Sequence, residues 1–235
     1  MNIQNQYMRQ LPVNKFIKIV HTSKICNINL GFFSKNSCKM YRNMDITEQI
    51  LRLNYAGLPI EWINYQTAVR LYCSDQVTYE CGDSSLIVRG GVSRITGQQS
   101  KIEINSIIAT KNYSKASYKD YTPPLTNRTL FQRDAKTCMY CGETFAVKDL
   151  SRDHIIPLSK GGEDKWMNSV TACKRCNNQK GNRTPEQANM PLLAIPFVPS
   201  RIEYLILRGR RIRADQMDFL LSHVPKTSLI RKRYK

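Results

Sequence analysis

Short apolar runs, separated by turn-forming residues, dominate the chain between residues 44 and 110. Runs rich in β-branched and aromatic residues predict β-strands. We expect strands at residues 50–53, 77–79, 86–88 and 102–108. Residues 63–72 place apolar side chains at helical spacing and predict a short helix. Turns are expected at residues 54–59 and at Gly90-Gly91. The pattern therefore predicts a small α+β region over residues 44–110.

The second half of the chain predicts more helix. Asn127 is a candidate N-cap for a helix over residues 128–134. A further helix is expected from Cys173 to Lys180. Thr184-Pro185-Glu186-Gln187 marks another helix start, because Thr suits the N-cap, Pro the first helical position and Gln the capping box. Residues 215–223 have the pattern of a C-terminal helix.

Between these helices the sequence predicts a β-hairpin with a long connection. Residues 152–156 are its first strand, and Pro157 and Gly161-Gly162 punctuate the connection. Trp166 is expected to anchor that connection in the core. We divide the chain into a basic N-terminal extension at 1–43, the α+β region at 44–110, a linker at 111–126, a domain at 127–190 and a basic C-terminal extension at 191–235.

The net charge of the chain indicates the class of its partner. The chain has 235 residues, with 36 Lys and Arg against 18 Asp and Glu, for a net charge of +18. Such an excess favours polyanionic partners, because their counterions are released on binding, although it does not separate DNA from RNA or an acidic membrane. No apolar run reaches the roughly 18 residues of a transmembrane helix, so we expect no membrane partner.

Residues 1–43 contain no Asp or Glu and several Lys and Arg. Three interpretations stay open: a basic arm that contacts nucleic acid, an extension upstream of a functional start at Met44, and a targeting presequence. The arm or the extension is favoured, and with it an intracellular protein of bacterial or phage type; organellar targeting is not excluded. The basic C-terminal segment is expected to contact a nucleic-acid backbone.

Four of the eight cysteines form two CxxC pairs, Cys138/Cys141 and Cys173/Cys176. Two such turns bring four thiolates together around one ion, the arrangement of a structural zinc site. The alternative is a disulfide or redox pair, which two CxxC pairs and the absence of secretory features disfavour. Thirty-one residues separate Cys141 from Cys173, so the insertion is expected to be folded.

That insertion carries the second candidate chemistry. Asp153-His154 followed by Pro157, then Gly161-Gly162, Asn168 and Cys176-Asn177 resembles the HNH endonuclease family over roughly residues 127–190. The resemblance implies an α+β fold in which a ββα-metal finger with structural zinc carries the active site. It also implies an enzyme, a metal-dependent endonuclease that hydrolyses DNA phosphodiester bonds.

The resemblance assigns roles residue by residue. His154 would be the general base, Asp153 and Asn177 would hold a catalytic divalent ion, and Asn168 would orient His154. Many relatives have His where this chain has Asn177, and an amide oxygen suits a hard ion such as Mg²⁺. Six basic residues near these positions are candidate contacts to nucleic acid: Arg152, Lys160, Lys174, Arg175, Lys180 and Arg183.

Two other functions remain open at this point. A non-catalytic zinc-finger module that binds nucleic acid needs the CxxC pairs and the positive charge, but does not need Asp153, His154 and Asn177 together. An RNA-directed nuclease is the third hypothesis. The partner is expected to be DNA, and a homodimer is left open.

Overall fold

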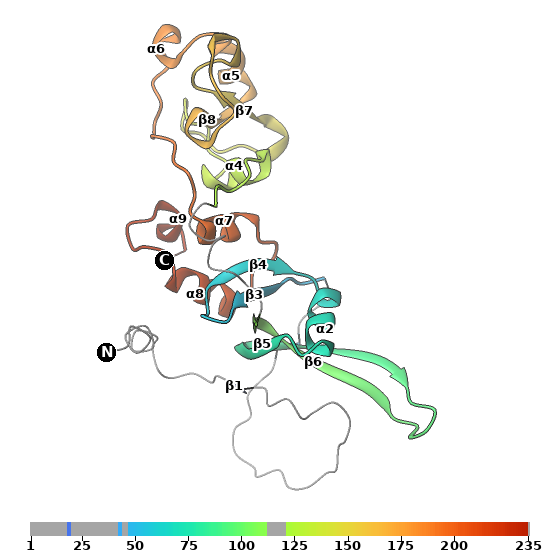
Figure 1. Cartoon of the computed structure of the whole chain (residues 1–235). Helices are drawn as coiled ribbons and strands as arrows, with labels where there is room; N and C mark the ends of the chain where they lie inside the picture. Colours follow the sequence, from blue (N-terminus) through green and yellow to red (C-terminus); the bar gives the residue numbers. More distant parts are fainter. Residues whose placement is uncertain (1–17, 20–41, 44–46, 112–120, 235) are drawn as a thin grey trace, which may run out of the picture. The chain divides into compact units, whose positions relative to one another are not determined.

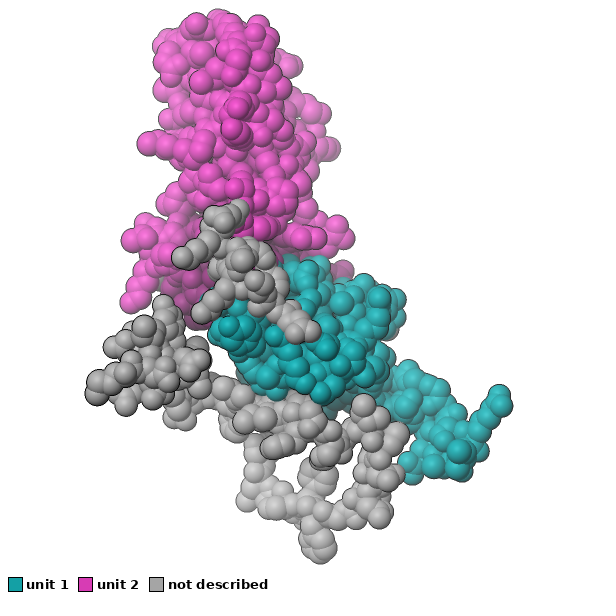
Figure 2. Space-filling model, viewed as in Figure 1, with its two compact units in different colours: residues 1–113 teal, residues 114–235 magenta. Residues whose placement is uncertain are grey.

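The computed structural model describes residues 18–19, 42–43, 47–111 and 121–234, and these group into two units, residues 1–113 and 114–235 (Figure 2). Most of the predicted extension at 1–43, the start at Met44, and the central part of the predicted linker lie outside the described residues. Among the described residues, no helix is long and apolar enough to cross a membrane.

Unit 1 is built on one mixed sheet (Figure 1). Its main strands are β3 (Ile50–Asn54), β4 (Pro59–Ile63), β5 (Val77–Val92) and β6 (Gln99–Thr110), with the short backbone segments β1 (Lys18–Ile19) and β2 (Arg42–Asn43) pairing with β5. The strand order is β1-β5-β6-β3-β4. β3 runs parallel to β6, whereas β3–β4 and β5–β6 are antiparallel.

The core of unit 1 lies between the sheet and α2 (Tyr65–Cys73). Ala68 of α2 is fully buried among apolar strand residues such as Ile50 and Ile108. The helix begins where it does because the Asn64 side chain accepts the backbone N–H of Thr67 at 2.9 Å. The α+β character predicted for this region is thus confirmed.

The strands of unit 1 differ from the prediction: β4 was not predicted, and β5 differs in two ways. The runs predicted at 77–79 and 86–88 belong to the single strand β5, whose register shifts between Cys81 and Ser85. Gly90-Gly91 lies inside that strand, and the reversal comes later, at residues 93–98. Local residue preferences do not predict either feature, because both depend on the pairing of β5 with β6 along the whole length of β5.

Unit 2 contains the predicted hairpin. Strand β7 (Leu150–His154) pairs antiparallel with β8 (Ser169–Cys173), and β8 leads directly into α5 (Lys174–Lys180). Before the hairpin lies α4 (Asn127–Arg133), capped by Thr126 rather than by Asn127 because the Thr126 hydroxyl reaches the N–H of Thr129. After α5 comes α6 (Pro185–Ala188), with the predicted capping box.

Three helices complete unit 2: α7 (Arg201–Arg208), α8 (Ala214–Ser222) and α9 (Leu229–Lys232). Tyr204 of α7 packs in one cluster with Leu130, Phe131, Leu150 and Trp166. Residues 191–235, predicted as an extension, therefore share a core with the hairpin domain. Trp166 is 3% exposed, as predicted, and its indole N–H donates to the carbonyl of Pro123 at 2.7 Å.

A buried arginine forms hydrogen bonds with several elements of unit 2. Arg133 is 1% exposed and its guanidinium pairs with Asp134 through two hydrogen bonds of 2.8 and 3.1 Å. It also donates to the carbonyl oxygens of Trp166, Ser169 and Phe197. Asp134 in turn accepts the N–H of Thr171 at 2.9 Å. This network joins α4, the hairpin connection, β8 and the segment that leads to α7.

We expect Arg133→Met to destabilise unit 2 by about 3–5 kcal/mol, because it leaves the buried Asp134 carboxylate without its partner. Arg128→Met, on the same helix but exposed, is the control and should change the unfolding free energy by no more than about 0.5 kcal/mol. Urea denaturation monitored by circular dichroism measures both. Equal losses for the two variants would show that the Arg133 network does not stabilise the unit.

Candidate active site and thiol cluster

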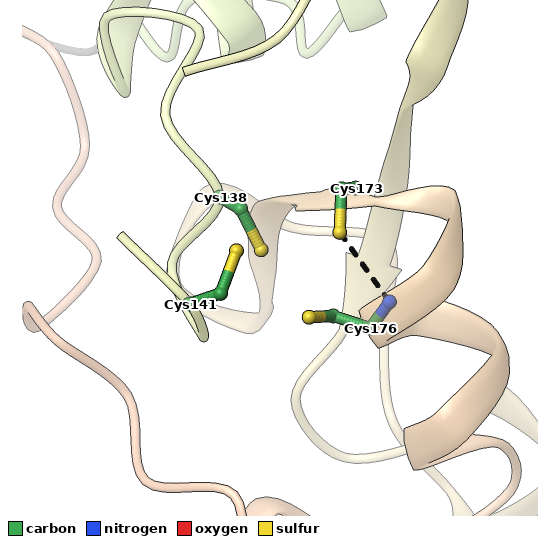
Figure 3. Close-up of side chains that lie close together, drawn as sticks. All are labelled: Cys138, Cys141, Cys173 and Cys176. Atoms are coloured by element: carbon green, nitrogen blue, oxygen red, sulfur yellow. Dashed lines mark hydrogen bonds between the residues drawn. The ribbon is translucent and has the colours of Figure 1, made fainter. Parts of the chain in front are cut away.

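The four CxxC thiols meet in one place. The sulfur atoms of Cys138, Cys141, Cys173 and Cys176 lie within 4.8 Å of one another and point toward a common centre (Figure 3). Cys138 and Cys141 lie in the turn after α4, Cys173 ends β8, and Cys176 lies in the first turn of α5. The cluster therefore joins the turn after α4 to the start of α5.

Backbone hydrogen bonds fix the conformation of the turn that carries Cys138 and Cys141. Cys138 N–H donates to the carbonyl of Glu143, and Gly142 N–H donates to the carbonyl of Cys138, both at 2.9 Å. Gly142 has φ +79°, a conformation that side chains disfavour. Met139 N–H bonds the carbonyl of Thr171 at 2.8 Å, which fastens this turn to β8.

The cluster fits zinc. A tetrahedral Zn–S distance of about 2.3 Å places sulfur atoms about 3.8 Å apart, which is compatible with four sulfur atoms that all lie within 4.8 Å of one another. Burial opposes ionisation of Cys138, but backbone N–H groups of Cys141, Cys173 and Tyr140 outweigh it and hold the pKa of this thiol below its usual value. Burial and the Cys173 thiol raise the pKa of Cys176. The donor set is suited to a thiolate-bound metal such as zinc.

Asp153 is buried beside a lysine and a tyrosine. Its carboxylate is 6% exposed and accepts Lys180 Nζ at 3.0 Å on Oδ1 and the Tyr140 hydroxyl at 2.5 Å on Oδ2. Lys180 also donates to the His154 carbonyl at 2.7 Å. Burial, followed by the hydrogen bond to Asp153, raises the pKa of Tyr140, so its hydroxyl stays a proton donor. A cation thus already contacts the carboxylate that was predicted to hold a metal.

His154, the next residue, pairs with a different carboxylate. His154 Nε2 lies 3.0 Å from Asp164 Oδ1. Asp164 is also held by Arg152, whose Nη1 lies 2.6 and 2.7 Å from its two oxygens. The hydrogen bond with His154, followed by that with Arg152, lowers the pKa of Asp164. Asp164 is therefore ionised and accepts from the imidazole.

Asn177 lies on α5, on the same side of the hairpin. Its Nδ2 donates to Ser151 Oγ at 2.9 Å, which leaves its carbonyl oxygen as the atom it can offer to an ion. Asp153, His154, Asn177 and Lys180 line one open hollow of about 270 Å³. The structure therefore brings three of the predicted site residues together from two rigid elements, β7 and α5.

Asn168 fastens the connection that carries Asp164. Its side chain accepts the N–H of Ile156 at 2.8 Å and donates to the carbonyls of Ile156 and Glu163. The close approach of this connection to Ile156 requires glycine at position 162, since a Cβ there would lie 1.9 Å from the carbonyl oxygen of Ile156. Asn168 makes no hydrogen bond to the His154 ring in the described part of the chain, and it orients the loop around that ring instead.

The six predicted nucleic-acid contacts differ in how accessible they are and in what they contact. Lys174 and Arg175 are exposed at the start of α5, and Lys160 is exposed with its Nζ on Gln187. Arg152 and Arg183 are engaged within the protein, Arg152 with Asp164 and Asn127, and Arg183 with carbonyls of α5. Lys180 is 1% exposed, so it lies inside the protein rather than on the surface that the prediction assumed.

Sequence reasoning missed two residues of the site, Tyr140 and Asp164, and it missed the role of Lys180 as the partner of Asp153. Tyr140 sits inside the first CxxC turn, where only the thiols were considered. Asp164 follows Gly161-Gly162 in a polar loop and has no pattern of its own. Their contacts are with residues distant along the chain, which periodicity does not report.

Comparison with known proteins agrees with this geometry. Residues 138–193 match the family model of HNH endonucleases. The chain is 36% identical over 70 residues to the CRISPR-associated endonuclease Cas9 1 of Streptococcus thermophilus, which covers 27% of this chain and 6% of that protein. It is 35% identical over 65 residues to the CRISPR-associated endonuclease Cas9 of Campylobacter jejuni, covering 25% and 7%.

Among solved structures, the Type II-C Cas9 enzyme from Actinomyces naeslundii is similar over 50% of this chain and 14% of its own length, with 23% identity and a TM-score of 0.26. The chain spans less than a tenth of the length of the curated relatives it matches.

We expect Cys138→Ser to lose bound zinc and to lower the melting temperature of unit 2, because removing one thiolate opens a site that fixes α5 to the turn after α4. Cys73→Ser, an exposed thiol in unit 1, is the control and should keep both properties. Zinc content by atomic emission and melting by calorimetry are the measurements. Full zinc content in Cys138→Ser would remove this residue from the ligand set.

Proposed function

We propose, from the match of residues 138–193 to HNH endonucleases, that this chain is a metal-dependent endonuclease that hydrolyses DNA phosphodiester bonds. The observation that carries the proposal is that Asp153, His154 and Asn177 line one hollow within the matched segment. A non-catalytic zinc finger requires no such convergence. The net charge of +18 supports a polyanionic substrate.

His154 is the base in this proposal. Asp164 is ionised and accepts a hydrogen bond, so it holds the proton of the imidazole on Nε2. Nδ1 then carries the lone pair that accepts a proton from the attacking water. The imidazolium that results is stabilised by the same carboxylate. Asp164 is thus a positioning residue, and Arg152 and Asn168 fix its place in turn.

Asp153 and Asn177 hold the divalent ion in this proposal, through a carboxylate and an amide oxygen, a donor set suited to a hard cation such as Mg²⁺. Such an ion neutralises negative charge on the leaving oxygen. Asp153 is buried and already contacts the ammonium group of Lys180 at 3.0 Å, so a metal ion at this carboxylate would have to compete with that cation. Tyr140 holds the second carboxylate oxygen and limits how the group can rotate.

We expect His154→Ala to cut supercoiled plasmid DNA at least about 100-fold more slowly than the parent chain with Mg²⁺ or Mn²⁺, the usual loss for a general base. The variant should keep its zinc and its affinity for DNA. His223→Ala, at the end of α8, serves as the matched control and should cleave normally.

Chelation of the added divalent ion, under conditions that leave the zinc content unchanged, should stop cleavage by the parent. A structured RNA offered alongside the plasmid tests the RNA-directed alternative. Cleavage by His154→Ala at the parental rate would show that another group is the base. DNA binding without cleavage by the parent would favour the zinc-finger alternative.

We expect Lys180→Met to lower the unfolding free energy in the absence of divalent ions by about 3 kcal/mol, because it leaves the Asp153 charge buried without its cation. Added Mn²⁺ should then raise the melting temperature of this variant more than that of the parent, since a divalent ion at Asp153 no longer competes with the ammonium. The exposed Lys174→Met is the control on the same helix. Equal Mn²⁺ shifts in all three chains would argue against a metal at Asp153.

A further inference from the structure

A β-ribbon extends from unit 1 beyond the part of the sheet that packs on α2 (Figure 1). It is formed by the end of β5 and the start of β6, and every residue from Arg89 to Lys101 is exposed. The core of unit 1 ends at Val88 and Ile102, which are half-buried. Residues 89–101, called the arm below, therefore contribute no buried residue to the core. An isolated two-stranded hairpin is only marginally stable, so stability alone does not explain the arm.

The base of the arm carries two like charges directly opposite each other. Arg89 and Lys101 are cross-strand partners in the β5–β6 pairing, and directly opposed side chains share a face of the ribbon. Two cations in such a pair destabilise a sheet by up to about 1 kcal/mol. An anion bound between them would reverse that cost.

In the described part of the chain, no acidic side chain pairs with Arg89 or Lys101. The arm contains no Asp or Glu, and its third charge is another cation, Arg94. Glu103 lies on the same face one step toward the core, but its carboxylate accepts the Ser85 hydroxyl at 2.8 Å. Within the described residues, Arg89 and Lys101 form no ion pair with Glu103 or any other acid.

The tip of the arm is held by hydrogen bonds and presents one apolar side chain. Ser93 N–H donates to the Gln98 carbonyl at 2.9 Å, Gly97 N–H donates to the Ser93 carbonyl at 2.8 Å, and Thr96 N–H donates to the Ser93 hydroxyl at 3.2 Å. These bonds hold Ile95 out at the end, 96% exposed. An apolar side chain presented on a rigid basic hairpin suits a partner that offers both anions and apolar base edges.

We propose that the arm, residues 89–101, binds duplex DNA by entering the major groove tip first, with Arg89 and Lys101 on the phosphates at its mouth. The major groove is about 12 Å wide and about 8.5 Å deep and admits a two-stranded ribbon. Ser93, where the turn begins, is four strand steps beyond Arg89, or about 13 Å at the usual strand rise. The arm is therefore longer than the groove is deep, so Ile95 can reach the floor while Arg89 and Lys101 extend their long side chains back to the phosphates.

Shape favours DNA over RNA as the partner. The major groove of A-form RNA is deep and too narrow for protein side chains to enter. The choice of DNA rests on the proposed function, but the arm lies in unit 1, outside the segment that matches HNH endonucleases. Binding by the arm can therefore be measured separately from cleavage.

The test uses the full chain carrying His154→Ala and a fluorescent 30-base-pair DNA duplex. Anisotropy titrations over a range of salt concentrations give affinity and salt slope. Arg89→Gln together with Lys101→Gln should weaken binding about tenfold at 100 mM salt and reduce the slope by about 1 to 2, since each lost phosphate contact removes about 0.9. Ile95→Ser should weaken binding while it leaves the slope unchanged.

The control pair, Arg70→Gln with Lys148→Gln, removes one exposed charge from each unit and should change the slope by no more than about 0.5. Without DNA, the arm variant should melt no lower than its parent, because the change removes a repulsion. An arm variant that binds like its control overturns the proposal, as does an RNA duplex of the same sequence that binds the arm as tightly as DNA. Loss of binding in the arm variant supports it, whether or not the parent chain cleaves DNA.

Discussion

The thiol cluster is the constraint on which the candidate site depends. Cys173 is at once the last residue of β8, the N-cap of α5 and a member of the cluster. Because Leu150 pairs with Cys173, the register of the hairpin is set from this end, and Asp153 and His154 fall opposite Val170 and Ser169. A one-residue slip would turn these two side chains to the opposite faces. An ion bound by the four thiols would therefore position α5 against β7 without touching the substrate.

Within this geometry, the carboxylates near the site in unit 2 are paired with specific partners. Each buried acid of the site region has a cation or hydrogen-bond donor assigned to it: Asp134 has Arg133, and Asp153 has Lys180 and Tyr140. Asp164 differs from these two acids because it is exposed, and it lies beside the His154 ring. In a chain with twice as many basic as acidic residues, the three carboxylates Asp134, Asp153 and Asp164 each contact a basic side chain.

The sequence predicted elements and spacing better than contacts. It predicted the hairpin, the helix after it, the capping box at Thr184 and the burial of Trp166, because each depends on local pattern. The convergence of the cysteines follows from the CxxC spacing alone. It missed β4, the length of β5, and the partners Tyr140 and Asp164, since these depend on residues far apart in the chain. Burial of Lys180 was missed for the same reason: a charged residue next to glycine in a basic stretch looks like a surface residue until Asp153 is placed beside it.

The two features that local rules explain least share one property. Lys180 is a lysine that is only 1% exposed, and Arg89 lies opposite Lys101 in a ribbon whose residues are all exposed. Sequences that fold well satisfy local preferences at most positions, and the violations gather at functional sites. In one case a fixed ammonium group stands beside a carboxylate suited to a metal ion. In the other, two cations are held together with no anion between them. The two cases differ in what a partner from outside the chain would do: a metal ion at Asp153 would compete with the Lys180 ammonium group, whereas an anion between Arg89 and Lys101 would relieve their repulsion and turn a cost in the free protein into affinity.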